Sequence, residues 1–550
     1  MKSQPKARII AGIIAAVVIA LIFWFTLPAL NLRSPGFWMF VLMSLAVVLV
    51  TQSFASLSGM KAGEGTEVDF GGTKVHLPGM PKFPKNRLNK ILLWVILGIV
   101  ALMIVASLIG AEIFHASRYQ SLIVKKDGNF TEDIATLEIE QIPVVDRDTA
   151  IKLGQRKLGE MSDLVSQFEI ADEYYTQINY QDRPVRVTPL VYGDIIKWFN
   201  NQSNGIPAYL RLDMASQDTE LVRLNEGIKY APCEYFMRDL KRHLRFGNPT
   251  RIFDDSYSFE IDENGTPYWI ASTITYRIGV WGGRDVEGAV LVNAITGEQK
   301  YYPVDQVPTW VDRVYHSELI LEQLNWNGQY QNGFWNSYFG QRGVLKTTEG
   351  YNYIANNDDV YLYTGMTSVA SDQSNVGFVL VNMRTKETKF YSVPGATEMS
   401  AAGSAEGQVQ DLGYRSTFPL LLNLTGRPTY FMSLKDGAGM VKMYAFVDVE
   451  KYQVVGTGST VQDAADNYHK AMQGSDASLS GGKAITAVIA EIHPVVKEGN
   501  TLYYFRLEGE EAIYVASIRL SDRLPFYKAG DSLTFTAYGE GDVRSVVTVE

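Results

Sequence analysis

Residues 91–111 read ILLWVILGIVALMIVASLIGA and contain no charged side chain. As an α-helix rising about 1.5 Å per residue, this run is long enough to cross a hydrocarbon core of roughly 30 Å. Two further uncharged runs precede it, at 9–32 and 34–60, and only Arg33 separates them. We therefore predict a membrane anchor of three N-terminal transmembrane helices within residues 1–115, followed by a water-soluble region.

The distribution of basic residues predicts how the three helices are oriented. Three lie within the first eight residues and six within the loop 61–90, whereas Arg33 stands alone between the first two runs. The positive-inside rule therefore places the N-terminus and the loop 61–90 in the cytoplasm. The large C-terminal region is then extracytoplasmic. The reverse orientation is the alternative, and it leaves nine basic residues outside.

The region after the anchor is acidic and almost free of cysteine. It contains 40 of the 50 Lys and Arg residues but 56 of the 60 Asp and Glu residues. Nucleic acid repels such a charge, so we expect no nucleic-acid partner. Cys233 is the only cysteine, which excludes an intramolecular disulfide and a multi-thiolate metal site. An extracytoplasmic region without disulfides indicates a multi-pass protein of a bacterial cell membrane.

Two segments 89 residues apart share a hairpin pattern. Residues 288–304, GAVLVNAITGEQKYYPV, and 377–393, GFVLVNMRTKETKFYSV, are identical at ten of 17 positions. Each has alternating apolar residues, a polar turn and a second strand with aromatics, as a β-hairpin does. Looser copies lie at 208–224 and 445–455. We predict a further strand before each copy, at 185–191, 268–276, 360–368 and 429–434, and a helix before three of them, at 146–168, 234–245 and 310–324.

This unit of a helix and three strands resembles the PepSY domain, a small extracytoplasmic bacterial module in which a helix packs on an antiparallel sheet. The residues that carry the likeness are 292-VNAITGE-298, with 265-GTPYW-269 in the strand before it. The later copies depart from the pattern, since Lys386 replaces the turn glycine. The resemblance implies repeated PepSY-like α+β units over 146–473 and a binding or peptidase-modulating role in the cell envelope, without catalytic residues.

The segments before and after the repeat region do not follow the repeat pattern. A charged neck is predicted at 116–145 and a Gly/Ser-rich linker at 474–482. Between the repeats and this linker, 459–472 has helical spacing, with Ser459 or Thr460 as its N-cap. Residues 483–550 alternate in about five short strands, at 484–492, 502–507, 512–520, 532–538 and 543–549, which favours a small β-barrel of the OB or SH3-like type.

Patterns that suggest catalysis or metal binding have simpler explanations. Six histidines show no spacing typical of a metal site. Residues 480–483 fit the S-x-x-K pattern, but such a short pattern occurs by chance and this one lies at the predicted linker. The carboxylate pairs at 254–255, 262–263 and 358–359 resemble turn and loop residues, although a hydrolase could use two of them as acid and base. We expect no metal ion, no cofactor and no catalytic residue.

The most unusual stretch is 325-NWNGQYQNGFWNSYFGQ-341, in which six aromatics alternate with Asn, Gln and Gly. Such a mixture suits stacking on sugar rings or peptide while the amides form hydrogen bonds. We select Trp326, Tyr330, Trp335 and Tyr338 as candidate ligand-binding residues. The competing interpretation is a buried aromatic loop that covers the edge of a sheet.

The sequence therefore predicts a membrane-anchored α+β protein with a non-enzymatic binding or scaffold function in the bacterial cell envelope. The expected partners are the lipid bilayer and either a cell-wall polymer or another envelope membrane protein. Two alternatives remain: a hydrolase of envelope polymer or peptide, and a sensor or accessory subunit of a membrane complex. Small residues in the first helix, among them Gly12, Ala15, Ala16 and Ala20, favour the second alternative.

Overall fold

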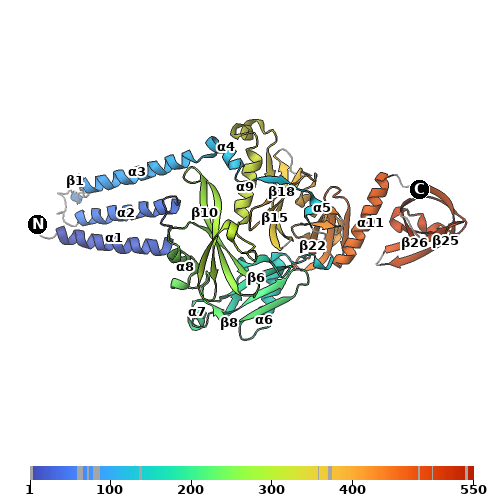
Figure 1. The fold of residues 1–550 in the computed structure, drawn as a ribbon, viewed down its shortest axis with the longest axis horizontal. Helices are drawn as coiled ribbons and strands as arrows, with labels where there is room; N and C mark the ends of the chain where they lie inside the picture. The colour runs from blue at the N-terminus through green and yellow to red at the C-terminus, as the bar shows by residue number, and fades with distance from the viewer. Residues whose placement is uncertain are drawn as a thin grey trace. The chain divides into compact units, whose positions relative to one another are not determined.

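The computed structural model describes residues 4–57, 66–70, 73–77, 87–134, 139–356, 358–369, 374–424, 426–480, 483–497, 500–538 and 543–549. It is a mixed α+β protein whose long apolar helices lie at the N-terminus and whose remaining chain is rich in β-strands (Figure 1). The chain divides into two compact units. Residues 1–129, 140–372 and 376–392 form the first, and residues 130–139, 373–375 and 393–550 form the second.

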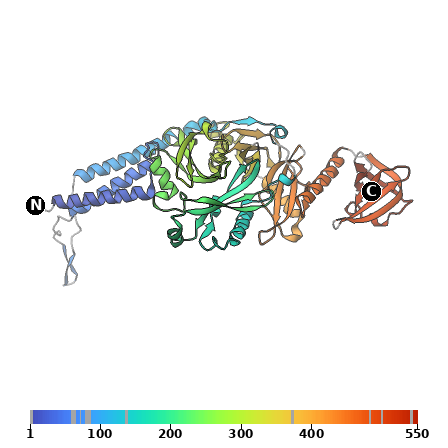
Figure 2. The ribbon, with the colours of Figure 1, turned by 60° about the horizontal axis from the view of Figure 1, so that its bottom comes forward.

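Three helices match the three predicted spans: α1 (Gln4–Thr26), α2 (Pro35–Leu57) and α3 (Arg87–Ile109). Each is long and apolar enough to cross a membrane, and the three lie side by side in both views (Figures 1 and 2). Their large apolar side chains mostly point outward, as lipid-facing residues do. On α1, Ala15 is buried, whereas Gly12, Ala16 and Ala20 are exposed on the outer face. Within the loop 61–90, β1 (Thr66–Phe70) and β2 (Thr73–Leu77) form a hairpin.

Four sheets follow, antiparallel apart from one strand added at the edge of the third, and their antiparallel strands share one order. The first has β4 (Phe168–Ile170) and β5 (Thr176–Tyr180) beside β6 (Arg183–Tyr192), then β7 (Ile206–Asp213) and β8 (Thr219–Ile228). The second is β9 (Phe253–Ile261), β10 (Pro267–Ile278), β11 (Gly282–Asn293) and β12 (Gln299–Pro303). The third has β13 (Leu345–Thr347) and β14 (Asn352–Asn356) beside β15 (Asp359–Ser368), then β17 (Gly377–Asn382) and β18 (Thr388–Tyr391). The fourth, in the second unit, has β20 (Arg415–Ser416) and β21 (Leu420–Leu424) beside β22 (Arg427–Lys435), then β23 (Val441–Asp448) and β24 (Val455–Gly458).

A helix precedes each sheet in the chain: α6 (Arg147–Gly159), α8 (Leu240–Gly247), α9 (Ser317–Gln329) and α10 (Glu398–Gln408). The Asp146 side chain caps α6 by accepting from the backbone N–H of Thr149. The three helices expected from sequence are shorter or shifted, and α9 begins at Ser317 rather than at 310. The sequence pattern missed α10, because its Gly- and Ser-rich residues have weak helical periodicity.

The two predicted hairpins are present and have the same register. Ala289 pairs with Tyr302 in one, and Phe378 pairs with Tyr391 at the equivalent positions of the other. Asn293 and Asn382 form the same turn, since each side-chain oxygen accepts two backbone N–H bonds of about 3 Å. Asp213 and Asp448 do the same in the first and fourth sheets.

The fifth residue of this turn has a left-handed backbone conformation, which explains why glycine occurs at that position in the sequence pattern. Gly297 has a φ of +77°, and Gln217 and Lys386 occupy the same left-handed region at +66° and +64°. Glycine adopts this region without the steric cost that a Cβ incurs. Lys386 therefore departs from the pattern in side chain but keeps its backbone geometry.

The described parts of the predicted neck 116–145, residues 116–134 and 139–145, belong to the folded region. Ile123 lies in the core shared by the second and third sheets, and β3 (Lys125–Asp127) adds to β18 as a parallel strand. The sequence did not reveal this, because a three-residue edge strand carries too short a pattern to recognise. The anchor is thus joined to the sheets without a free spacer.

The C-terminal region is a closed barrel with the strand order β25–β26–β27–β29–β28. Its strands are β25 (Lys483–Lys497), β26 (Asn500–Leu507), β27 (Ile513–Ser517), β28 (Ser532–Tyr538) and β29 (Val543–Val549). The preceding helix α11 (Val461–Ser480) is capped by Thr460. It continues through most of the segment expected to be a linker, 474–482, because a single glycine among Ala, Ser, Asp and Leu costs a helix only about 1 kcal/mol.

Candidate functional site

The aromatic stretch 325–341 begins on the last turn of α9 and continues into a short π-helical turn (η5, Asn336–Gly340). Its first two candidate residues pack on α4 (Glu112–Gln120), the helix that follows the third candidate span. The rings of Trp326 and Tyr119 meet edge-to-face at 4.7 Å. Tyr330 is fully buried, and Trp326 is half-buried. These two rings hold the stretch against the end of the membrane anchor.

Glu112 fixes both rings through hydrogen bonds. Its Oε1 accepts from Trp326 Nε1 at 2.9 Å, and its Oε2 accepts from the Tyr330 hydroxyl. Burial, together with the adjacent Glu112 carboxylate, raises the pKa of Tyr330 well above its ordinary value, so the phenol stays protonated as a donor. Glu112 lies three residues after the end of α3, and this short separation ties the position of the stretch to the end of the third candidate span.

The other two candidate residues are exposed to solvent. Trp335 and Tyr338 are 62% and 58% exposed, and Phe339, which sequence reasoning did not select, is 81% exposed. We call Trp335, Tyr338 and Phe339 the aromatic patch. Phe334 supports it with ring-centroid distances of 5.4 Å to Trp335 and 4.9 Å to Tyr338. Trp335 and Phe339 stack on each other at 5.9 Å.

The backbone beneath the aromatic patch is held by amide side chains. Asn332 and Asn336 both donate to the carbonyl oxygen of Arg342, at 2.8 and 3.0 Å. The structure therefore divides the four predicted residues into two that anchor the loop and two that it presents to solvent. Sequence reasoning also missed Glu112, and the one available signal was a single carboxylate directly after an uncharged span.

The most strongly perturbed carboxylates lie elsewhere, in the interior of the first unit. Glu260 on β9 accepts from the backbone N–H groups of Asp312 and Arg313 at 2.8 and 3.0 Å. Asp312 Oδ2 accepts from the backbone N–H of Asn179 at 2.6 Å. Burial raises the pKa of both carboxyl groups, and the nearby Glu260 carboxylate raises the pKa of Asp312 further.

Arg313 completes this buried cluster and connects it to two other sheets. Its guanidinium lies 3.4 Å from the ring centroid of Tyr353 on β14, and its Nε donates to the carbonyl oxygen of Gln177 on β5 at 3.2 Å. Glu260 and Asp312 are 0% and 1% exposed, so a polymer or peptide cannot reach them. The cluster joins the first, second and third sheets and does not form a catalytic cleft.

The carboxylate pairs noted in the sequence have structural partners. Asp262 accepts from two backbone N–H groups in the turn before β10, and Asp359 pairs with Arg384 at 2.8 Å. Asp255 pairs with Lys241 at 3.2 Å on the surface. Over the described part of the chain, no group of three or more His, Cys, Asp or Glu residues could hold a metal ion.

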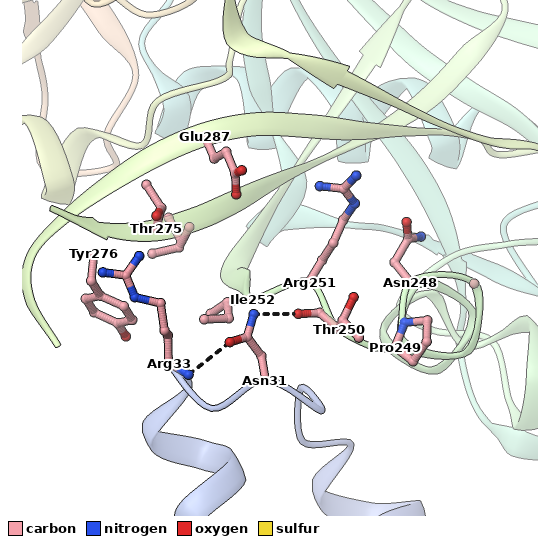
Figure 3. A pocket seen from close by; sticks show the side chains of 12 residues that line it. Asn31, Arg33, Asn248, Pro249, Thr250, Arg251, Ile252, Thr275, Tyr276 and Glu287 are labelled. Carbon is pink, nitrogen blue, oxygen red and sulfur yellow. Dashed lines mark hydrogen bonds between the residues drawn. The ribbon is translucent and has the colours of Figure 1, made fainter. Parts of the chain in front are cut away.

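A surface cavity of about 500 Å³ lies where the turn between α1 and α2 meets the second sheet. Figure 3 shows Arg33 of this turn and Arg251, just before β9, on opposite sides of the cavity, with Glu287 of β11 between them. Asn31 is held by its amide, which donates to the carbonyl oxygen of Thr250 at 3.0 Å and accepts from the Arg33 backbone N–H at 2.9 Å.

Comparisons with known proteins do not assign the chain to a family. No family model matches the sequence, and no curated protein is significantly similar to it. A crystal structure of an ACO/RPE65 chimera is similar to this chain at 11% sequence identity, covering 69% of this chain and 64% of that one. Its TM-score of 0.14 is too low to inform the fold or the function.

Proposed function

We propose that the chain is a non-enzymatic binding or scaffold protein of the bacterial cell envelope, with its sheets outside the cytoplasmic membrane. Charge supports this orientation, because nine basic residues flank the proposed inner ends of the helices. A contact supports the number of spans, though it is the same in either orientation: the backbone N–H of Leu30, in the α1–α2 turn, donates to the carbonyl oxygen of Pro249 at 2.8 Å. The turn and the sheets therefore share one side of the membrane, as three spans require.

The architecture within this proposal is a series of PepSY-like units and an OB-like barrel. Four sheets with the same strand order, each preceded by a helix, support the units. The matching register of the β11–β12 and β17–β18 hairpins supports a common repeat. The order of the five barrel strands, with β27 and β29 parallel, supports an OB-like Greek-key barrel.

The aromatic patch is the observation that carries the binding function. Three large rings stay in water on a loop that is braced by Phe334, Asn332 and Asn336, so their exposure does not result from a loosely held backbone. Exposed, pre-organised aromatics lose little entropy on binding and stack on flat or ring-shaped ligands. We infer that the ligand is a polymer of the cell wall, presented to the patch close to the membrane.

Retention of the full-length chain on purified, insoluble cell-wall material tests this function. Trp335→Ala and Phe339→Ala should each lower retention of the detergent-solubilised protein several-fold, because each removes an exposed stacking ring. Phe526→Ala is the matched control, since Phe526 is a 78% exposed aromatic residue that belongs to the other compact unit of the chain. Unchanged retention of both patch variants, with melting temperatures like that of the wild type, would refute the proposal.

A second role, as an accessory subunit of a membrane complex, is favoured by one face of α1. Gly12, Ala16 and Ala20 are exposed at four-residue spacing, which lets another helix approach closely. Replacing Gly12 and Ala16 with Leu should then abolish co-purification of a second membrane protein from detergent extracts. Ala20→Gly is the control that keeps the face small. If wild-type extracts yield this chain alone, the role is excluded.

A further inference from the structure

The cavity at the α1–α2 turn lies at the level of the lipid headgroups. Its wall includes Asn31 and Arg33, which lie between the candidate spans Ile9–Thr26 and Pro35–Ser53. A turn of this length cannot carry residues far from the ends of the two helices, because an extended chain spans at most about 3.6 Å per residue. The cavity therefore opens where phospholipid headgroups meet the protein.

The residues of the turn alternate between the cavity and the surroundings. Asn31 and Arg33 line the cavity, whereas Leu30 and Leu32 are 44% and 65% exposed. Exposed leucines beside a membrane-spanning helix contact acyl chains rather than water. A molecule that occupies the cavity thus has an apolar surface next to it, as a lipid requires and a free ion does not.

The adjoining surface of the second sheet also faces the bilayer. Phe246 on α8 contacts the rings of Phe23 and Trp24 at the end of α1, with centroid distances of 6.2 and 6.3 Å. The Arg242 guanidinium lies 4.3 Å from the Trp24 ring centroid. Further exposed apolar residues continue this surface on α7 (Ile195–Asn201) and the 3₁₀ turn before α8: Ile195, Ile196, Phe199, Phe236 and Met237.

The charges of the cavity match a headgroup that carries a phosphate and an amine. Among the described residues, neither Arg33 nor Arg251 has a carboxylate within salt-bridge distance, and Glu287 has no cationic partner. Arg251 is held in place by stacking on Tyr301, 3.2 Å from its ring centroid. Guanidinium groups bind phosphate oxygens through charge-assisted hydrogen bonds, and a carboxylate binds a primary ammonium.

We propose that this cavity binds the headgroup of a membrane phospholipid, with its phosphodiester on Arg33 and Arg251 and a primary amine on Glu287. An ethanolamine headgroup supplies both groups. This site is separate from the aromatic patch and does not depend on the proposed cell-wall ligand. Its occupancy would tie the second sheet to the bilayer at the turn where α1 and α2 meet.

Native mass spectrometry of the delipidated full-length chain in detergent tests the proposal. The probes are phosphatidylethanolamine, phosphatidylglycerol and phosphatidylcholine, with glycerophosphoethanolamine and inorganic phosphate as soluble forms of the same chemistry. We expect phosphatidylethanolamine to bind most tightly, because it is the one lipid of the three that offers both a phosphodiester and an unblocked amine. The soluble probes should bind much more weakly, since they lack acyl chains. Tight binding of inorganic phosphate with no preference for lipid would overturn the lipid assignment.

Four variants locate the site. Arg33→Gln and Arg251→Gln should each weaken phosphatidylethanolamine binding about tenfold, the effect of losing one charge-assisted hydrogen bond. Glu287→Gln should make the affinities for phosphatidylethanolamine and phosphatidylglycerol equal, because it removes the carboxylate that binds the amine. Arg118→Gln is the matched control, because Arg118 is an exposed arginine of α4 that does not line the cavity. Arg33 is itself exposed, so its variant should fold, and wild-type affinity of folded Arg33→Gln would refute the proposal.

Discussion

Trp326 Nε1 lies 2.9 Å from Oε1 of Glu112, a residue 214 positions earlier in the chain. The same carboxylate accepts the hydroxyl of Tyr330. Through this pair of hydrogen bonds, the first residues beyond α3 hold the base of the loop that presents Trp335, Tyr338 and Phe339. The geometry of the candidate binding surface therefore depends on the membrane anchor.

Removing the Glu112 carboxylate should destabilise the first unit. Glu112→Ala leaves a buried phenol and an indole N–H without an acceptor, at a cost of about 1 to 3 kcal/mol for each. Glu112→Gln keeps one acceptor oxygen and should cost less. Thermal melts of the detergent-solubilised chain should therefore give the highest melting temperature for the wild type, a lower one for Glu112→Gln and the lowest for Glu112→Ala. Equal melting temperatures for all three would contradict the role assigned to Glu112.

The exposure of two tryptophans predicts that replacing one destabilises the fold strongly and that replacing the other hardly changes its stability. Trp269 on β10 is fully buried, so Trp269→Ala should cost about 3 to 5 kcal/mol through lost burial and a cavity. Trp335 is largely exposed, and Trp335→Ala should change the free energy of unfolding by less than about 0.5 kcal/mol. Chemical denaturation of the two variants measures both values. A large loss for Trp335→Ala would mean that the patch is part of the core.

The left-handed turn residues allow a matched comparison. Lys386 Nζ lies 2.5 Å from Asp285 Oδ1, with both side chains mostly buried, whereas the Gln217 side chain is exposed. Gln217→Gly should stabilise the fold by about 0.5 to 1 kcal/mol by relieving the positive φ. Lys386→Gly gains the same relief but loses the ion pair, at a cost of about 3 to 5 kcal/mol, so it should be net destabilising. Stabilisation by both substitutions would show that the ion pair contributes little.

The buried carboxylates should make stability fall as pH rises. Burial raises the pKa of Glu260 from 4.5 to about 7 in the folded chain. The folded state therefore binds more protons than the unfolded state between these values, and stability decreases from about pH 4.5 to 7. Glu260→Gln removes one titrating group, so its melting temperature should depend less on pH across this window. The slope should not vanish, because the pKa of Asp312 is also raised. Parallel pH profiles for wild type and variant would refute this assignment.

Accessibility to a membrane-impermeant thiol reagent tests the orientation. In a Cys233→Ser background, Val496→Cys should be labelled on intact cells, since Val496 is exposed on β25 of the barrel. Gly72→Cys, in the loop 61–90, should react only after the cells are opened. Burial raises the pKa of Cys233 to about 12, so little thiolate forms there and the unmodified chain is a low-background control. Labelling of position 72 but not of position 496 on intact cells would show that the chain has the reverse orientation.

Some elements could be predicted from the sequence because their signals are local. The spans follow from uncharged length, and the long central strands follow from alternation, so the expected 268–276 corresponds closely to β10, Pro267–Ile278. The repeated turn could be recognised because an Asn or Asp that caps its own backbone leaves the same residue at the same place in each copy. β3 and α10 escaped prediction, because one is too short and the other too weakly periodic.

The candidate site was predicted only in part. The composition of 325–341 identified the stretch, but it could not separate buried rings from exposed ones, because Trp and Tyr are equally suited to a core and to a binding surface. Glu112 makes that separation by fixing Trp326 and Tyr330, and its partners lie more than 200 positions away in the chain.

The sequence alone determined the three apolar spans, the hairpin pattern and the barrel strands, since each depends on residues that are close together in the chain. The tertiary structure decided which rings face water, that Glu260 and Asp312 join three sheets instead of lining a cleft, and that Arg33, Arg251 and Glu287 surround one cavity. These relationships depend on residues that only folding brings together, and burial then determines which of them can meet a ligand.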